Sequence, residues 1–370
     1  MKKTRTLTFH FPINNGAFLQ AYALQRVLIE QCSVDNEIID YRSPNQEATY
    51  SIIQPMRRKS DVIKNAFSLL HYGKLKCRQQ SFYRMQRDFL RMTERVTADE
   101  QVYRLAEEAD LNIVGSDQVW NTSISACTPA FFLPGVRAKK ITYATSMGSR
   151  ASIDLIAKYV ADIKEFEALG VREPTVLPVL DFYDKEKTIV LDPTLLLEKS
   201  DYSRLYTSSP TKKKYILLYS MRFSTELLKN VKRIADAMGL TVIVPFTTYK
   251  AVNCLKYHFR LVYDASPDVF LDLVDNAELV LTNSFHGTAF SVIYGKKFFH
   301  ICDLKDGLEQ RDDRIDDLLD ALQIDRNVSS KTDISDIIGA DDIPYAEVET
   351  RLAELRATSI DFLQRQIEGA

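Results

Sequence analysis

The stretch TNSFHGTAF occupies residues 282–290 and lies where a buried strand gives way to a helix. The apolar run AELVL (277–281) precedes it, and GTAFSVIYG (287–295) continues with helical spacing. His286, one of five histidines in the chain, therefore stands at the tip of a predicted strand. A strand followed directly by a helix is the unit from which parallel α/β sheets are built, so this stretch decides the fold class.

The same alternation of strand and helix runs through the chain in two series. In the first series we predict strands at 7–12, 36–41, 110–115 and 139–146, with helices at 18–31 and 152–169. In the second series we predict strands at 215–220, 241–246, 278–283 and 296–301, with helices at 225–239, 266–277 and 287–295. Two such series predict two Rossmann-type domains with parallel sheets that face a central cleft.

The chain of 370 residues is long enough for two domains, and a polar, charged gap at 198–214 separates the two series. We therefore expect an N-terminal domain at 1–205 and a C-terminal domain at 206–344. A final amphipathic helix within 345–370 is expected to pack back on the first domain.

Composition narrows the class of protein. The net charge of −2 gives no support for nucleic-acid binding. Five scattered cysteines fit reduced thiols in the cytoplasm better than a disulfide framework, and no zinc-binding spacing occurs. We find no signal-peptide core and no run of 18 apolar residues, so we expect a cytoplasmic protein.

Polar residues at the predicted strand end of the second domain form the first candidate site. Backbone N–H groups at a helix start suit an anion such as phosphate, and Gly287 permits close approach. Asn283, Ser284 and Thr288 add side chains that can form hydrogen bonds, and His286 can act as an acid or base. A helix cap with a structural histidine is the alternative interpretation.

Two strand ends of the first domain carry similar residues. Ser116, Asp117 and Gln118 follow a buried strand, and Asp117 is expected to bind a sugar hydroxyl or act as a base. Asn15 and Gly16 follow the first predicted strand and form a candidate ligand turn. The alternatives are a capping aspartate and ordinary turn chemistry.

Cations for an anionic ligand are expected from Arg172, Arg222 and Arg314, because a guanidinium can hold a carboxylate or phosphate with two hydrogen bonds. For Arg172 the alternative is a structural pair with the adjacent Glu173. Arg314 lies among acids, and Asp192 in LDPT also reads as a turn residue before a proline.

Residues 56–95 form a helical, basic segment. Eleven lysines and arginines minus three acids give a charge of +8 over forty residues, with aromatic and leucine side chains interleaved. Such a segment fits an anionic membrane surface or a lipid-linked phosphate acceptor. A helical face covered by solvated cations is the alternative interpretation.

Taken together, several motifs resemble the polysaccharide pyruvyl transferase family. They occur in order across most of the chain: NNGAFLQAYALQRVL (14–28), NIVGSDQVWN (112–121), KKITYATSMGS (139–149), VREP (171–174), VLDPTLLL (190–197), PDVFLDLVDNAELVLTNSFHGTAFSVIYGKKFF (267–299) and RIDDLLDALQIDR (314–326). GSDQVWN and TNSFHGTAFS are the specific ones. The resemblance implies a GT-B-like fold and transfer of pyruvate from phosphoenolpyruvate to a sugar of a bacterial surface polysaccharide, as a ketal.

The implied chemistry gives the candidate residues roles. His286 is the expected acid, and either Asp117 or Asp192 is the expected base. Arg172, Arg222, Arg314 and the helix start at 284–288 are expected to hold the donor. The scheme requires no metal or cofactor. The expected partners are phosphoenolpyruvate, a sugar acceptor in free or undecaprenyl-diphosphate-linked form, and an anionic membrane at its inner face.

Two other functions fit the same fold pattern. A GT-B glycosyltransferase would use a nucleotide sugar and would need an acid for the donor ribose. No acid follows TNSFHGTAF until Asp303. A non-catalytic protein of a polysaccharide pathway is the second alternative, and the combination of His286, Arg172 and Asp117 disfavours it.

Overall fold

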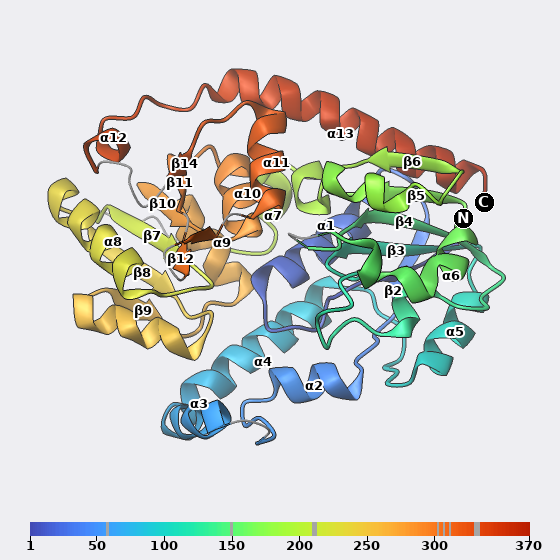
Figure 1. Ribbon diagram of the computed structural model, residues 1–370, viewed down its shortest axis with the longest axis horizontal. Coiled ribbons are helices and arrows are strands. Elements are labelled where there is room, and N and C mark those ends of the chain that lie inside the picture. Colours follow the sequence, from blue (N-terminus) through green and yellow to red (C-terminus); the bar gives the residue numbers. More distant parts are fainter. Residues whose placement is uncertain are drawn as a thin grey trace. The chain divides into compact units, whose positions relative to one another are not determined.

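The computed structural model (Figure 1) describes residues 1–56, 59–148, 151–208, 213–301, 303–305, 308–310, 312–328 and 334–370. These residues divide into two compact α/β units. The first unit combines Met1–Pro55, Tyr83–Leu197 and Leu352–Ala370, and the second combines Met56–Phe82 and Glu198–Arg351.

Within the described residues, the first unit is built on one sheet of six parallel strands in the order β2-β1-β3-β4-β5-β6. The strands are β1 (Lys3–Leu7), β2 (Asp35–Ile38), β3 (Leu111–Asp117), β4 (Lys139–Thr145), β5 (Ala168–Val171) and β6 (Glu186–Ile189). Its helices include α1 (Asn15–Glu30), α2 (Pro44–Tyr50), α5 (Asp99–Glu107) and α6 (Val160–Lys164). The strand order reverses between β1 and β3, where ligands bind in open α/β sheets.

The first strand lies earlier than the sequence pattern predicts, at Lys3–Leu7 instead of 7–12. Its residues KTRTL look too polar for a buried strand, but their side chains are satisfied by the neighbouring strand β2. The Arg5 guanidinium forms an ion pair with Glu37, and the Asn36 amide donates hydrogen bonds to Thr4 and Thr6. Hydrophobicity alone could not reveal this pairing.

The predicted helix at 152–169 is wrong over most of its length. Short 3₁₀ turns, Ile153–Leu155 and Ala157–Tyr159, lead into α6, and β5 already begins at Ala168. The segment after α6 forms β5, which pairs with β4 on one side and β6 on the other. Its buried apolar residues therefore belong to a strand and not to a helix. A short apolar run cannot be assigned to helix or strand by periodicity alone.

The second unit repeats the architecture with a sheet of six parallel strands among its described residues, in the order β14-β11-β10-β7-β8-β9. The strands are β7 (Tyr215–Tyr219), β8 (Thr241–Pro245), β9 (Arg260–Val262), β10 (Leu279–Thr282), β11 (Phe298–Ile301) and β14 (Asn327–Val328). A separate antiparallel pair joins β12 (Asp303–Lys305) and β13 (Leu308–Gln310). The strand order reverses between β7 and β10.

The helices α8 (Thr225–Met238), α9 (Pro267–Asp275) and α10 (Phe285–Ile293) lie close to the places predicted for them. The second unit also contains α7 (Lys199–Tyr202), α11 (Asp313–Leu322) and α12 (Ile334–Ile338), for which no helix was predicted. The helix α8 is typical: Ser224 accepts a hydrogen bond from Leu227 N at its start, and Gly239 ends it with a φ of 65°.

The basic segment contributes two consecutive helices, α3 (Lys59–Leu70) and α4 (Tyr72–Phe89). Arg57 and Arg58 lie outside the described residues. The part up to Phe82 belongs to the second unit, whereas the sequence pattern placed all of 56–95 in the first. Aromatic stacking explains the difference, because the Phe67 ring lies 5.9 Å from the Phe246 ring, which follows β8.

The last helix, α13 (Tyr345–Glu368), also crosses the boundary between the units. Its part from Leu352 onward belongs to the first unit, where Ser359 Oγ accepts a hydrogen bond from Leu191 N at 2.9 Å. A Cβ at Gly170 of β5 would lie 2.9 Å from the Phe362 ring, so the helix packs closely on this sheet. No helix in the described part of the chain has the length and apolar character needed to cross a bilayer.

Candidate active site

The carboxyl edge of the second sheet collects most of the residues predicted for the donor site. Asn283 and Ser284 directly follow β10, and Arg222 lies three residues after the end of β7. These two strands flank the point where the strand order reverses. The topology therefore brings together segments that are about sixty residues apart in sequence.

Helix α10 begins at this edge, where Gly287 lets the helix pack closely on β7 and β10 and does not leave room for a ligand. Ser284 is the N-cap residue, but its side chain forms no capping hydrogen bond. The Ser284 N–H donates instead to Thr282 Oγ1 at 3.1 Å. A Cβ at Gly287 would lie 2.1 Å from Thr282 Oγ1, so only glycine fits there. The first-turn N–H groups of a helix have no acceptor inside it and attract anions.

Side chains beside the α10 start have unused hydrogen-bonding capacity. Asn283 Oδ1 accepts a hydrogen bond from Met221 N at 2.9 Å, which links the loops after β7 and β10. The buried Nδ2 of Asn283 and the buried Oγ1 of Thr288 have no hydrogen-bond partner among the described residues. His286 is half-buried, with its ring 5.3 Å from the Phe285 ring in an edge-to-face arrangement. Buried polar atoms of this kind are uncommon and mark places where a ligand can bind.

The two predicted cations of the second unit differ in their surroundings. Arg222 is exposed, and its guanidinium forms no ion pair with any residue in the described ranges. Arg314 lies in the first turn of α11. Its guanidinium contacts both carboxylate oxygens of Asp312, at 2.8 and 2.5 Å. Arg222 therefore keeps its charge available for a ligand, whereas Arg314 is already neutralised.

The sequence analysis did not single out Arg78, which it counted only among the cations of the basic segment 56–95. The Arg78 side chain is buried, and its guanidinium lies 5.2 Å from the Phe82 ring and 5.7 Å from the Phe246 ring. Burial lowers the pKa of Arg78 to about 10, although Tyr219 and Asp264 act in the opposite direction. Tyr219 ends β7, so Arg78 adds positive charge near the same carboxyl edge. In the sequence, the aromatic residues near Arg78 were the signal that could have indicated its burial.

At the first sheet, the loop after β1 holds residues predicted as a ligand turn. Asn14 Oδ1 caps α1 by accepting hydrogen bonds from Gly16 N at 2.8 Å and Ala17 N at 3.4 Å. The Gly16 N–H therefore already donates a hydrogen bond within the protein. Asn15 is buried, and its Oδ1 has no hydrogen-bond partner among the described residues.

Asp117 ends β3 in a strained conformation, with a φ of 71°. Positive φ is uncommon for a residue with a side chain and often marks a functional position. One Asp117 carboxylate oxygen accepts from Gln118 N at 2.8 Å, and the residue is half-buried. Burial and the nearby Asp117 carboxylate raise the pKa of Tyr50 to about 12. The Gln118 side chain accepts from Asn121 Nδ2 at 2.8 Å.

Arg172, Asp192 and Ser116 lie together, but in a sealed network. The Arg172 guanidinium donates to Asp192 Oδ2 at 2.8 Å and to Glu173 Oε1 at 2.7 Å. Ser116 Oγ donates to the same Asp192 oxygen at 3.0 Å, and Thr194 contacts the other through its amide and hydroxyl. The Asp192 side chain is 0% exposed, and that of Arg172 is 4% exposed.

This network favours a structural role for Arg172 and Asp192. Burial acts to lower the pKa of Arg172, but the carboxylates of Glu173, Asp192 and Asp117 outweigh it and raise that pKa. The Arg–Glu pair that the sequence offered as an alternative is present. Donor binding by Arg172 and base catalysis by Asp192 stay predictions that this geometry disfavours.

Another buried network at the first sheet was not predicted. His10, three residues after β1, is 0% exposed, and its Nε2 lies 3.0 Å from Asp40 Oδ1. Asp40 also accepts from Arg42 Nε at 2.6 Å and Arg42 Nη2 at 3.1 Å. Burial alone would raise the pKa of Asp40, but hydrogen bonds and charges of His10 and Arg42 lower it well below its usual range.

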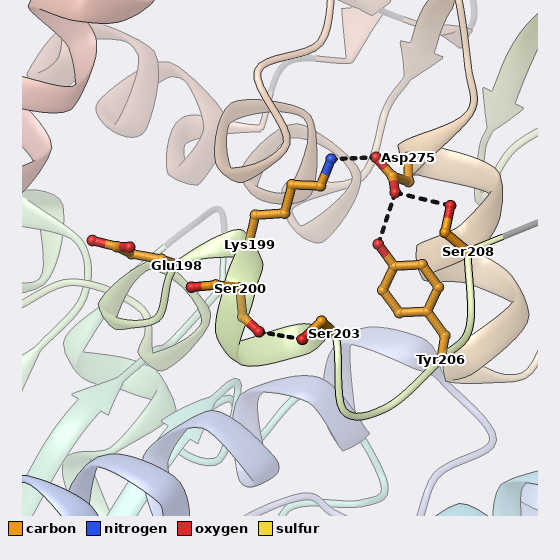
Figure 2. A pocket seen from close by; sticks show the side chains of 7 residues that line it. All are labelled: Glu198, Lys199, Ser200, Ser203, Tyr206, Ser208 and Asp275. Carbon is orange, nitrogen blue, oxygen red and sulfur yellow. Dashed lines mark hydrogen bonds and ion pairs between the residues drawn. The ribbon is translucent and has the colours of Figure 1, made fainter. Parts of the chain in front are cut away.

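A cavity of about 510 Å³ lies elsewhere in the second unit (Figure 2). Asp275, the last residue of α9, forms its centre, with Lys199 Nζ at 2.5 Å and Tyr206 OH at 3.0 Å. Lys296, which precedes β11, donates to the Asp275 carbonyl. These segments lead into the amino ends of strands, so this cavity is on the opposite edge from the residues described above.

Comparison with known proteins places the chain in a family. Residues 14–301 match the family described as Polysaccharide pyruvyl transferase. No curated protein matches the chain in sequence.

Solved structures show the likeness in fold. The UDP-GlcNAc 2-epimerase of Methanocaldococcus jannaschii, in complex with UDP-GlcNAc and UDP, aligns with a TM-score of 0.51 at 14% identity over 100% of both chains. A putative UDP-N-acetylglucosamine 2-epimerase from Listeria monocytogenes gives 0.53 at 10% identity, over 97% of this chain and 94% of that one. The trehalose-6-phosphate synthase OtsA gives 0.50 at 9% identity, over 99% and 98%. The fold is thus GT-B-like, as predicted. The central cleft and the domain ranges stay predictions.

Proposed function

The chain belongs to the polysaccharide pyruvyl transferase family, and we propose that it transfers pyruvate from phosphoenolpyruvate to a sugar of a bacterial surface polysaccharide or its lipid-linked precursor. The product is a ketal between the pyruvate carbonyl carbon and two sugar hydroxyls. The observation that carries this proposal is the start of α10, where the buried Asn283 Nδ2 and Thr288 Oγ1 have no hydrogen-bond partner among the described residues.

Phosphoenolpyruvate presents a phosphate and a carboxylate, so its site needs N–H donors and cations. The α10 start supplies amides, and the Asn283 Nδ2 supplies a donor that no described residue uses. Arg222 supplies a guanidinium that forms no ion pair among the described residues, and Arg78 adds buried positive charge. We assign the donor to this edge of the second unit.

The reaction begins when an acid protonates the methylene carbon of the enol, and a sugar hydroxyl attacks C2. The C2–phosphate bond then breaks, and the second hydroxyl closes the ring on C2. One of the two hydroxyl protons replaces the proton that the acid gave to the new methyl group. The other leaves with phosphate. We assign the acid role to His286, because histidine is the residue type that most often transfers protons in catalysis.

The attacking hydroxyl needs a base, and the geometry favours Asp117 over Asp192. Asp117 is half-buried at the end of β3, so a ligand can reach its carboxylate. Asp192 is enclosed and already accepts from Arg172, Ser116 and Thr194. A carboxylate tied to a buried guanidinium is a poor base, because protonation would leave that cation unpaired.

The proposal is tested by turnover of phosphoenolpyruvate in deuterium oxide with a panel of methyl glycosides and lipid-linked glycosides. The expected result is phosphate release that depends on the sugar, with one solvent deuterium in the methyl group of the ketal. Mass spectrometry and proton NMR of the product report both features. Release of UDP from a UDP-sugar, with no reaction of phosphoenolpyruvate, would instead place the chain among the glycosyltransferases.

A further inference from the structure

Helix α3 carries its apolar residues on the outside. Val62, Ile63, Leu69 and Leu70 are 55%, 66%, 66% and 81% exposed. Positions i, i+1, i+7 and i+8 lie on one face of an α-helix, and Ala66, also exposed, lies between them. A surface helix of a folded protein normally turns this face inward. A contiguous exposed patch of this kind marks an interaction surface.

The opposite face of α3 is fixed to the second unit, which keeps the apolar face outward. Asp61 and Ser68, seven residues apart, are buried. The Phe67 ring stacks 4.2 Å from the His71 ring and 5.9 Å from the Phe246 ring. His71 in turn stacks on Tyr263 at 5.4 Å. The aromatic contacts anchor the helix, so its outward face is set by packing.

Exposed positive charge follows α3 in the chain, at the start of α4. Lys74 and Lys76, in the first turns of α4, are exposed, and the Lys74 ammonium lies 4.3 Å over the Tyr263 ring. Asp61 is the one acidic residue in the sequence from 59 to 82, and it is buried on the inward face. Tyr72, the first residue of α4, is 47% exposed. Apolar side chains flanked by lysines and an amphipathic aromatic ring fit the interface of an anionic membrane.

We propose that the α3–α4 segment from Lys59 to Phe82 docks on an anionic lipid surface, with Val62, Ile63, Leu69 and Leu70 inserted at the headgroup level. Charge complementarity selects this occupant over a second copy of the chain, because a two-fold contact would bring Lys74 and Lys76 close to their own copies. The link to catalysis rests on the proposed function, since docking would bring the enzyme to a lipid-linked acceptor.

The test is flotation of the full-length protein with vesicles of phosphatidylcholine mixed with phosphatidylglycerol, and with pure phosphatidylcholine vesicles. The parent protein is expected to float with the anionic vesicles and to be released by high salt. Lys74→Glu/Lys76→Glu should reduce partitioning at least ~25-fold, since each lysine contributes about fivefold near an anionic surface. Leu69→Ser/Leu70→Ser should reduce it at least ~10-fold.

Matched control variants use exposed residues on other elements of the second unit. Leu255→Ser removes a leucine that is 51% exposed, and Lys229→Glu reverses an exposed charge on α8. Both controls should float like the parent, and all variants should keep the parent's melting temperature.

Three results would overturn the proposal. These are no flotation of the parent, equal flotation of the parent and the variants of the α3–α4 segment, or a dimer that Leu69→Ser/Leu70→Ser converts to a monomer in light scattering. Binding of phosphoenolpyruvate is measured on the same samples. It shows whether failure of membrane docking is separate from failure of the proposed function.

Discussion

The carboxyl edges of the two sheets carry similar residue types but use them differently. At the first sheet, Arg172 is enclosed with Asp192 and Glu173, and His10 is enclosed with Asp40. At the second sheet, His286 and Asn283 are half-buried and Arg222 is exposed. Most charged groups at the first edge are paired with one another, whereas Arg222 at the second edge remains exposed.

A charged residue at a strand end is therefore not by itself a ligand-binding residue. Buried ion pairs hold loops in place, and their groups are too well paired to exchange protons with a substrate. We therefore expect substitutions at the first edge to change stability, except at Asp117, and substitutions at the second edge to change binding and turnover.

The largest expected effect is on stability. Arg172→Met should lower the free energy of unfolding by about 3–5 kcal/mol, because it leaves Asp192 and Glu173 buried without their cation. Urea unfolding followed by circular dichroism measures this loss. Replacing Asp192 with Asn in the same chain should restore part of it. If Arg172→Met instead keeps full stability and loses phosphoenolpyruvate binding, the structural assignment of the first edge is wrong.

His286→Asn should lower kcat about 10²–10⁴-fold, as expected for loss of a general acid, with little change in stability. Asn keeps polarity and approximate size but cannot donate a proton. Steady-state release of phosphate, with thermal unfolding as the control, measures both quantities. A drop in melting temperature that accounts for the lost activity would make His286 a structural residue.

Asp40→Asn should destabilise the protein by about 1.5–3 kcal/mol at neutral pH, since it removes the charge that pairs with Arg42 and His10. The folded-state pKa of Asp40 lies below its unfolded value of about 3.9, so its stabilisation is present above that pH and is lost as pH falls below it. The difference between parent and variant should therefore shrink in acid. A difference that stays constant down to low pH would contradict the ionic origin.

The smallest effect is expected at the exposed cation of the second edge. Arg222→Ala should weaken phosphoenolpyruvate binding about 10-fold and leave stability unchanged, because an exposed charge contributes to ligand contacts but little to folding. Lys250, an exposed cation in the 3₁₀ helix Tyr249–Tyr257 of the same unit, provides the matched control Lys250→Ala. Equal affinity in both variants would remove Arg222 from the donor site.

Much of the fold could be predicted because strand and helix periods are clear in most segments, as in β7, α8 and β10. The pattern failed where polar residues are satisfied by neighbours, as for Thr4, Arg5 and Thr6 in β1. Site residues on α10 were predictable from their place after a strand. Pairing of Arg172 with Asp192, twenty residues away, depends on how strands align, and burial of Arg78 depends on aromatic packing; sequence spacing reports neither.

The central claim, that the second sheet's edge holds the donor, is tested most directly by calorimetric titration of phosphoenolpyruvate, with UDP-GlcNAc in parallel. The account predicts that phosphoenolpyruvate binds the parent, that Arg222→Ala weakens binding, and that Asp117→Asn leaves it unchanged. The claim would be contradicted if UDP-GlcNAc alone binds, or if Asp117→Asn abolishes phosphoenolpyruvate binding while Arg222→Ala has no effect.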